Sequence, residues 1–469
     1  MTIHFPPIQS RQLFARIARV DGTWRSNVLL RWNADGMLTG VEADSVCPNG
    51  VDTAAGPVLP GMSNLHSHAF QRAMAGLTEY RATAADSFWS WRDLMYRFAT
   101  RISPDDLDAI ARWLYIEMLK CGYTSVCEFH YVHHAPDGQR YANPAEMASR
   151  TVGAATDSGI GITVLPVLYQ YGGFGCAPPN PSQQRFIQSP DELLAMVDAL
   201  RDGFPESVSR RYGVAPHSLR AVSDRSLSTV IDGLHRVAPD APVHIHIAEQ
   251  MAEVTACVDA YGQRPVEWLL DHMPVDSRWC LVHATHVSDS EVQSLARSGA
   301  VAGLCLTTEA NLGDGIFPME EYLQAGGKFG IGSDSHIAVD WRSELRLLEY
   351  GQRLTRHRRN VLTSERESHV ADHLFDGAVD GGALASGRPV GQLHVGSLAD
   401  LIVLHNDHDA IAEHAPDSWL SSVVFGEHGG NPIRDVMVAG RWVIQEGQHA
   451  NETAARAAYR ACLKRLLRS

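Results

Sequence analysis

The stretch LPGMSNLHSHAFQRAMAGL, residues 59–77, places two histidines two positions apart at the end of a short apolar segment. Side chains at positions i and i+2 of a β-strand point to the same side, so His66 and His68 would share one face. Two imidazoles on one face near a strand end can bind a single metal ion. The chain contains 23 histidines, so a chance surface pair is the alternative, and the rest of the sequence has to decide.

Strand-like segments alternate with helical patterns through the middle of the chain. Seven such segments follow the histidine pair, at residues 124–132, 161–169, 210–218, 242–250, 280–287, 300–308 and 328–336. Amphipathic patterns such as DDLDAIARWLYIEMLKCG, residues 105–122, lie between them. With the strand before His66, the pattern contains eight strand–helix units, which is typical of a (β/α)8 barrel. We therefore predict an α/β fold with a TIM-type barrel over residues 59–387.

The two ends of the chain have a different pattern. Residues 1–58 contain short alternating segments such as NVLLRWNADGMLTGVEA, which are typical of β-hairpins. Similar segments return over residues 388–450, and a helical pattern follows at 451–469. We predict that the two β segments pair into one small β-sandwich domain beside the barrel, and that the chain ends in a helix.

Composition and charge restrict the partners of the chain. Its 469 residues carry a formal net charge of −14, which argues against nucleic acid and anionic membranes because both attract basic surfaces. No apolar run approaches the ~20 residues of a membrane span, and the first residues lack the pattern of a signal peptide. The eight cysteines form no CxxC pair, so we expect reduced thiols and a cytoplasmic protein.

Metal-binding and titratable side chains follow almost every predicted strand. The set comprises His66, His68, Glu128, His130, His217, Arg220, His244, His246, Glu249, His283, His286, Glu309, Asp334 and His336. Core packing would prefer apolar groups, so their abundance indicates a site at the carboxyl ends of the strands. Three imidazoles and one carboxylate suit a zinc or iron ion, and candidates for them are His66, His68, His246 and Asp334. His244 points to the same side as His246 but lies further from the strand end, which favours a supporting or core role.

The segments PGMSNLHSH, VHIHIAEQ, LVHATH and GIGSDSH together resemble the amidohydrolase superfamily, and the resemblance covers essentially the whole chain. It implies a metal centre whose ligands are His66, His68, His246 and Asp334. Members with two metals bridge them with a carboxylated lysine, but the only lysine between His68 and His246 is Lys120, in a helical pattern ahead of the second strand. We therefore expect one divalent ion, with Zn²⁺ preferred and Fe²⁺ also acceptable to this ligand set.

The mononuclear branch of the superfamily with His-x-x-Glu after the fifth strand consists largely of deaminases, which implies hydrolysis at a C=N carbon. Such a reaction needs an activated water, a base for its proton and an acid for the departing nitrogen. The expected roles are base for Asp334, orientation of the water for His283, and proton transfer to nitrogen for Glu249. The alternatives are a solvated loop residue for Glu249 and a buried structural histidine for His283.

The segments HSHAFQRAMAGL, FWSWRDLMYRF, EFHYVHH, APHSLRAV and TTEANLGDG resemble those of the formimidoylglutamate deiminases within this superfamily. The resemblance implies a small dicarboxylate substrate with a cationic formimidoyl group, and substrate contacts from Gln71, Arg92, Tyr131, His217 and Arg220. Arginine presents a planar donor fork that matches a carboxylate, so Arg92 and Arg220 are expected to bind the two carboxylates. The alternatives are a helix-surface arginine for Arg92 and an ion pair at a helix start for Arg220.

Two other functions fit parts of the pattern. A deaminase of a ring substrate, such as guanine, cytosine or an adenosine derivative, would use the same metal ligands but a pocket built for stacking. A non-catalytic barrel would have lost metal ligands, and all four are present. By analogy with similar barrels we expect a homodimer, and residues 78–100 are suited to a lid over the barrel mouth. The role of Glu309 stays open.

Overall fold

The computed structural model describes residues 11–79 and 88–468, and parallel β-strands form its centre. One sheet has the order β5 (Met62–Ser67), β6 (Tyr123–His130), β7 (Gly161–Leu168) and β8 (Arg210–Tyr212), and β9 (Ala215–Pro216) also pairs with β7. A second sheet has the order β10 (Val243–Ile247), β11 (Trp279–His283), β12 (Val301–Leu304) and β13 (Lys328–Ile331). All these pairings are parallel, which confirms the predicted α/β class.

Isolated parallel bridges join the two sheets at both of their edges. Val214, after β8, pairs with the first residue of β10, and Ser67 at the end of β5 pairs with Asp334 after β13. At the second join, the backbone N–H of Asp334 donates to the carbonyl oxygen of His66 at 3.0 Å. The N–H of His68 donates to the carbonyl oxygen of Asp334 at 3.2 Å. The first and last parallel strands are therefore neighbours, and the histidine pair lies beside Asp334.

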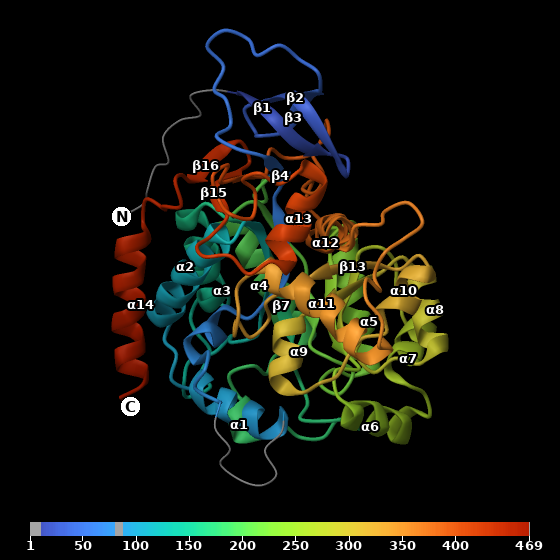
Figure 1. Ribbon diagram of the computed structural model, residues 1–469. Helices are drawn as coiled ribbons and strands as arrows, with labels where there is room; N and C mark the ends of the chain where they lie inside the picture. Colours follow the sequence, from blue (N-terminus) through green and yellow to red (C-terminus); the bar gives the residue numbers. More distant parts are fainter. Residues whose placement is uncertain (1–10, 80–87, 469) are drawn as a thin grey trace.

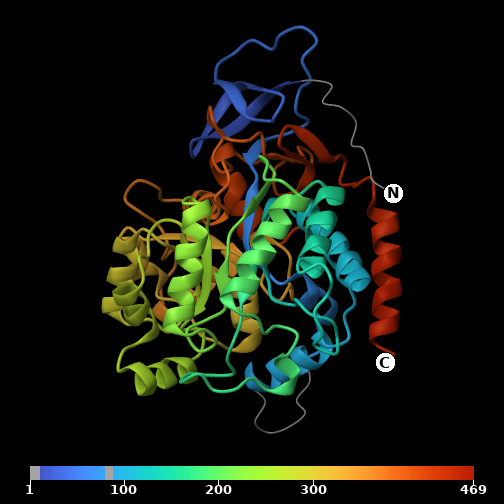
Figure 2. The ribbon, with the colours of Figure 1, turned by 180° about the vertical axis from the view of Figure 1, so that it is seen from behind.

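Helices follow the parallel strands and lie outside them (Figures 1 and 2). They are α1 (Phe88–Ala99), α2 (Pro104–Lys120), α3 (Glu146–Ser158), α4 (Pro190–Gly203), α5 (Asp224–Val237), α6 (Met251–Tyr261), α7 (Pro265–His272), α8 (Asp289–Ser298), α9 (Leu306–Leu312), α10 (Met319–Gln324), α11 (Trp341–Arg356) and α12 (Val370–Ser386). Capping explains several starts: Ser103, Ser189 and Ser288 each accept the N–H of the third helical residue, whose acidic side chain accepts a backbone bond in return. Among the described residues, no helix is both long and apolar enough to cross a membrane.

Strands from both ends of the chain share a third sheet. Its order is β16 (Arg441–Ile444), β15 (Ile433–Val438), β14 (Leu401–Leu404), β4 (Val58–Pro60), β1 (Gln12–Val20), β2 (Thr23–Trp32) and β3 (Leu38–Glu42). β14 pairs with β4 in antiparallel fashion, so the C-terminal strands attach directly to the N-terminal ones. Two further helices are α13 (Pro416–Phe425) and α14 (Glu452–Leu466), and α14 packs along α2 (Figure 1).

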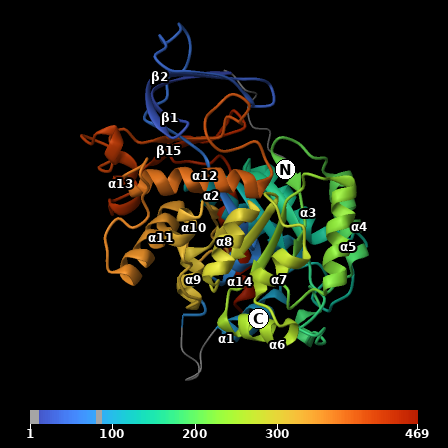
Figure 3. The same cartoon turned by 90° about the vertical axis from the view of Figure 1, so that its right-hand side faces the viewer.

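The long helix α12 lies between the terminal sheet and the parallel strands (Figure 3). On the side of the terminal sheet, Arg19 of β1 donates to Asp372 and to Asp376 of α12, each at 2.6 Å. Arg19 is almost fully buried, so its charge depends on these two carboxylates. The helix therefore ties the terminal sheet to the strands that carry the site.

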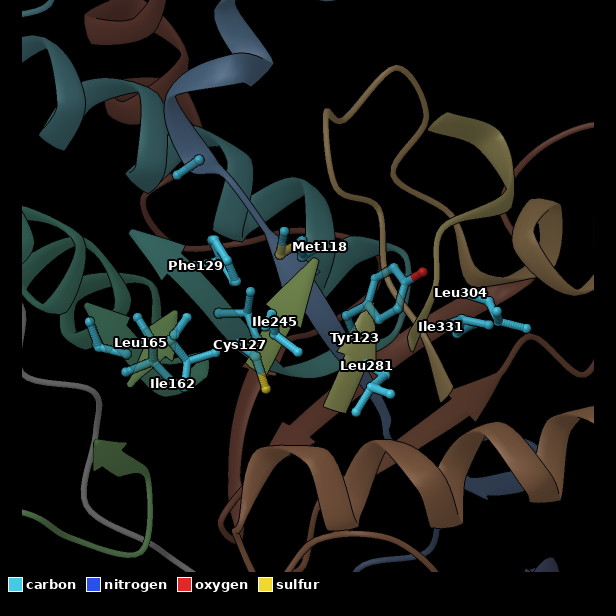
Figure 4. Packing of buried hydrophobic residues seen from close by; sticks show 14 of the residues in the cluster. Met118, Tyr123, Cys127, Phe129, Ile162, Leu165, Ile245, Leu281, Leu304 and Ile331 are labelled. Atoms are coloured by element: carbon cyan, nitrogen blue, oxygen red, sulfur yellow. The ribbon is translucent and has the colours of Figure 1, made fainter. Parts of the chain in front are cut away.

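Apolar side chains of the parallel strands form the core beneath the strand ends. Phe129, Leu165, Ile245, Leu281 and Ile331 come from five different strands, and all are buried in one cluster with the surrounding helices (Figure 4). Close packing of this kind leaves little freedom to the backbone that it surrounds. The polar residues that follow the strands therefore stand on a rigid base.

Two glycines allow α12 to pack against β13 and β5. A Cβ added at Gly381 would lie 1.7 Å from the carbonyl oxygen of Phe329, and one added at Gly382 would lie 2.9 Å from the Cβ of Ser63. Neither contact is with the end of a flexible side chain, so neither could be relieved by a rotamer change. The close approach of the helix to the two strands requires glycine at these positions.

Replacement of Gly381 by Ala should destabilise the protein, because the new methyl group overlaps the Phe329 carbonyl and must move α12 away from β13. We expect the free energy of unfolding, measured by urea denaturation, to fall by about 1–3 kcal/mol. Gly153→Ala is the matched control, because Gly153 lies in α3 with open space around its Cα. Alanine there should raise the stability by up to ~1 kcal/mol. A Gly381→Ala variant as stable as the wild type would contradict this account of the packing.

Candidate active site

Three imidazole nitrogens meet at the carboxyl ends of β5 and β10. The Nε2 atom of His66 lies 3.1 Å from Nε2 of His68 and 2.9 Å from Nε2 of His246. The Oδ1 atom of Asp334 lies 3.3 Å from the His68 nitrogen and 3.5 Å from the His66 nitrogen. All four side chains are buried. The structure therefore brings together the four residues that the sequence predicts as metal ligands.

A histidine ring must be neutral at one nitrogen to bind a metal ion, so the pKa values of these three rings matter. Burial lowers the pKa of His68 to about 3, and it lowers the pKa of His66 and of His246 well below the usual value. The Nδ1–H of the neutral His68 ring donates to the carbonyl oxygen of Phe129 at 2.9 Å, so its Nε2 presents a lone pair to the other rings. The ring nitrogens of His66, His68 and His246 lie within 4.8 Å of one another, close enough for one ion to contact all three. These three imidazoles, with the Asp334 carboxylate beside them, are a donor set that fits a divalent metal ion.

Three carboxylates surround His283 at the end of β11. Its Nδ1 lies 3.2 Å from Oε1 of Glu309, and its Nε2 lies 3.6 Å from Oε1 of Glu249 and 3.9 Å from Oδ2 of Asp334. Burial by itself would lower the pKa of His283, but these negative charges outweigh burial and raise the pKa well above its usual value. Burial raises the pKa of Glu249 to about 7, against the opposing charge of His283. A carboxyl group with that pKa can both accept and release a proton near neutral pH.

A pocket adjoins these groups and contains every residue that the sequence predicts for substrate contact or catalysis. Its lining consists of His68, Gln71, Phe88, Trp91, Arg92, Met95, Tyr96, Tyr131, His217, Arg220, His246, Glu249, His283, Leu312 and Asp334. Polar groups from one end of several strands and aromatic groups from α1 thus face the same space. Two arginines, Arg92 and Arg220, form a cationic wall of this pocket, and carboxylates lie beside His283.

Arg220, which follows β9, places a buried cation in the pocket wall. Only 9% of the residue is exposed, and its Nη1 atom has no hydrogen-bond partner among the residues that the structure describes. Burial opposes the charge, but the neighbouring Tyr169, Tyr96 and Glu253 side chains raise the pKa of Arg220 above its usual value. A buried cation with an unused donor is costly unless a ligand supplies an acceptor. The position therefore suits an anionic group of a substrate.

The other predicted substrate contacts surround the same space. Arg92 reaches the pocket from α1, and its guanidinium carbon lies 5.5 Å from the ring centre of Tyr96. The amide of Gln71 donates to the hydroxyl of Tyr131 at 2.7 Å. Burial and the charge of Arg220 lower the pKa of His217 well below its usual value, so this imidazole is neutral. The wall thus offers two guanidinium groups and several neutral hydrogen-bonding groups.

Two buried carboxylates beside Glu249 were missed by sequence reasoning. Glu253, in the first turn of α6, accepts the backbone N–H of Glu249 at 3.3 Å. Asp314, after α9, accepts a hydrogen bond from the side chain of Gln250, and Glu249, His283 and Asp314 offer atoms within 4.8 Å of one another. The four-residue spacing from Glu249 to Glu253 is a signal for the first of them. For Asp314, the only local signal is its place between two glycines.

His244 and the predicted lid have separate outcomes. The Nε2–H of His244 donates to the carbonyl oxygen of Ala385 in α12 at 2.8 Å, so this histidine has the core role and stays outside the ligand group.

In the segment predicted as a lid, α1 contributes Phe88 and Trp91 to the pocket lining. Residues 80–87 of that segment lie outside the described residues, so the lid stays a prediction.

Comparisons with known proteins agree with the resemblance seen in the sequence. Residues 58–443 match the model of the amidohydrolase family. A formimidoylglutamate deiminase of Pseudomonas aeruginosa is 49% identical over 97% of this chain and 99% of its own. A 5-methylthioadenosine/S-adenosylhomocysteine deaminase of Halobacterium salinarum is 26% identical over 87% of this chain and 89% of its own.

Solved structures agree with this result. The crystal structure of an amidohydrolase from Brucella melitensis superposes with a TM-score of 0.91 at 45% identity, over 98% of this chain and 100% of that chain. An adenosine deaminase from Xanthomonas campestris, solved with bound zinc, superposes with a TM-score of 0.79 at 21% identity, over 98% of both chains. At that lower identity, the likeness concerns the fold alone.

Proposed function

Because the chain belongs to the amidohydrolase family, we propose that it hydrolyses N-formimidoyl-L-glutamate to N-formyl-L-glutamate and ammonia. The observation that carries this proposal is the 49% identity to a formimidoylglutamate deiminase over 97% of the chain. The pocket supports it independently, because Arg92 and Arg220 both line it and the substrate has two carboxylates. A ring substrate such as guanine would offer these two cations no carboxylate to bind.

The proposed architecture is a closed (β/α)8 barrel over residues 59–387, joined to one small β-sandwich domain built from residues 1–58 and 388–450, with a final helix at 451–469. The two isolated bridges between the parallel sheets support closure of the barrel. The pairing of β14 with β4 supports a domain made from both ends of the chain. A homodimeric state and a cytoplasmic location are further proposals, which rest on analogy and on cysteine usage.

One divalent ion would be held by His66, His68, His246 and Asp334, with Zn²⁺ preferred and Fe²⁺ accepted by the same donors. Bound there, the ion would lower the pKa of a water molecule toward neutrality and so supply a nucleophile. Lys120, the only lysine between His68 and His246, lies at the end of α2 and pairs with Glu452 at 2.8 Å. This supports a single ion, because the one candidate for a bridging lysine is engaged elsewhere.

The reaction adds the oxygen of water to the formimidoyl carbon and releases the terminal nitrogen of that group as ammonia. Asp334 would accept the proton that the attacking water loses. Glu249, whose pKa of about 7 suits a proton carrier, would deliver a proton to the departing nitrogen. His283 would hold the attacking oxygen from its Nε2 side and stabilise the negative charge that develops on it. Both hydrogens of the water leave its oxygen and end on the released ammonia: Asp334 would take the first, Glu249 would take the second as the carbonyl forms, and both protons would pass to the nitrogen through Glu249.

The glutamate part of the substrate would bind to the cationic wall of the pocket. Arg220 has the unused Nη1 donor that a carboxylate would satisfy, and Arg92 would bind the second carboxylate. Gln71, Tyr131 and His217 would add neutral hydrogen bonds between the two charged ends. This arrangement would place the formimidoyl group next to Glu249 and the metal ligands, because Glu249 and three of the ligands, His68, His246 and Asp334, line the same pocket.

The purified protein should release ammonia from N-formimidoyl-L-glutamate and not from guanine, cytosine or adenosine. Metal removal by a chelator should abolish the release, and one equivalent of Zn²⁺ or Fe²⁺ should restore it. A coupled assay measures ammonia, and elemental analysis should find about one ion per chain. Release of ammonia from guanine but not from N-formimidoyl-L-glutamate would contradict this proposal and favour the ring-substrate alternative. Full activity after complete removal of metal would contradict the metal site.

Glu249→Gln should lower kcat by a factor of ~10² or more, because the amide cannot carry a proton to the departing nitrogen. Metal content should stay as in the wild type, since Glu249 is not among the proposed ligands. Steady-state kinetics and elemental analysis on the same preparation test both points. Turnover close to that of the wild type would remove Glu249 from the mechanism.

Arg220→Met should raise KM by about 10-fold to 100-fold with metal content unchanged, because a charged hydrogen bond to the substrate carboxylate is lost. Arg358→Met is the matched control, because Arg358 is an exposed arginine that pairs with Glu320 outside the pocket lining. The control should have the KM of the wild type. A parallel loss of bound metal in Arg220→Met would show that the arginine is structural instead.

A further inference from the structure

Glu309 is a buried carboxylate of the site to which the proposed reaction gives no task. It lies in α9, after β12, and only 1% of the residue is exposed. Its Oε1 atom accepts the backbone N–H of Cys305 at 2.9 Å and also faces Nδ1 of His283 at 3.2 Å. Its Oε2 atom is buried without a hydrogen-bond partner in the described part of the chain. Such a group costs stability, which indicates that its position serves another purpose.

His283 leaves β11 in an unusual direction. Its φ is +67°, in the left-handed region that residues other than glycine rarely adopt, and Ala284 follows with a φ of +48°. The backbone N–H of Ala284 donates to the carbonyl oxygens of Ile247 and Val282, each at 3.0 Å, which holds this conformation. The backbone thus directs the His283 side chain toward the metal-ligand group, but it does not fix the rotation of the imidazole about the Cβ–Cγ bond.

The contact with Glu309 fixes that rotation. When Nδ1 faces Glu309, Nε2 lies 3.6 Å from Oε1 of Glu249 and 3.9 Å from Oδ2 of Asp334. A half-turn of the ring would exchange Nδ1 with Cδ2 and Nε2 with Cε1, and all three polar contacts would be lost. Oε1 of Glu309 already accepts the backbone N–H of Cys305, so it is an acceptor oxygen and Nδ1 of His283 is the donor in this pair. One carboxylate thereby sets the orientation of the imidazole ring.

We propose that Glu309 is a positioning residue, which accepts the Nδ1–H bond of His283 so that Nε2 faces the reacting oxygen between Glu249 and Asp334. This inference rests on the proposed function, because the reacting oxygen belongs to that reaction. A carboxylate that orients a functional histidine through its second nitrogen is a recurrent arrangement around metal sites. Here the two partners come from different elements, β11 and α9, and both are almost fully buried.

Glu344 offers a matched control. It is a fully buried carboxylate that also contacts the first turn of α9, but it is not among the carboxylates that pair with His283 in the described part of the chain. Its two oxygens accept the backbone N–H of Thr307 at 3.0 Å and the Thr307 hydroxyl at 2.5 Å. Glu344→Gln therefore disturbs the anchoring of α9 without a direct effect on the His283 ring. A role of Glu309 through helix anchoring alone would appear equally in this control.

Two variants of Glu309 test whether its role depends on the oxygen that accepts the hydrogen bond from His283 or on the bulk of the side chain. Glu309→Leu removes the acceptor at similar volume, whereas Glu309→Gln keeps an acceptor oxygen. We expect kcat for ammonia release to fall roughly 10-fold to 100-fold in E309L and less in E309Q, with KM and metal content little changed. E344Q should keep the kcat of the wild type. An unchanged kcat in E309L, or equal losses in E309L and E344Q, would overturn the proposal.

A crystal structure of E309L adds a measurement that does not depend on activity. We expect the His283 ring to turn or move so that Nε2 no longer faces Glu249, and an unchanged ring would contradict the proposal. If the wild type releases no ammonia, the proposed function fails, while the ring orientation still tests the role of Glu309. If E309L does not fold, Glu309→Ala replaces it and is judged by the same measurements.

Discussion

Two backbone hydrogen bonds between the end of β5 and the segment after β13 are the constraint on which the site depends. They join His66 and His68 to Asp334, which lies at the far end of the series of parallel strands. Because strand pairing fixes the register, a shift by one residue would turn both imidazoles to the opposite side. Backbone pairing therefore brings these side chains together, and the side chains themselves provide the metal-binding groups.

The strand ends that carry the site also carry backbone strain. Residues other than glycine with positive φ lie at or just after the ends of β10, β11 and β13, namely Ala248, His283, Ala284, Asp334 and His336. Conformations of this kind cost about 1–3 kcal/mol each and persist only where the surroundings hold them. The buried core under the strands and the bridges between the sheets provide that support. These backbone conformations lower the stability of the fold, but they direct the side chains at the strand ends toward the site.

Sequence reasoning succeeded where the signal is local and failed where it depends on another element. The alternation of strands and helices and the His66–His68 pair are visible in short segments, so both were predicted. Strand periodicity alone puts His244 and His246 on the same side. The distance from the strand end favoured a supporting or core role for His244, but its acceptor, Ala385 of α12, lies far along the chain and could not be foreseen. Asp314 was missed for the same reason, since it gains its importance only beside Glu249 and His283.

The pairing of β14 with β4 has a consequence for the synthesis of the chain. β1, β2, β3 and β4 leave the ribosome early, whereas β14 lies near the other end of the sequence. At ~5–20 residues per second, β4 waits on the order of tens of seconds for its neighbour. An open strand edge can pair with other chains during that interval. The edge of β4 is therefore open in the growing chain and becomes covered only when β14 has been made.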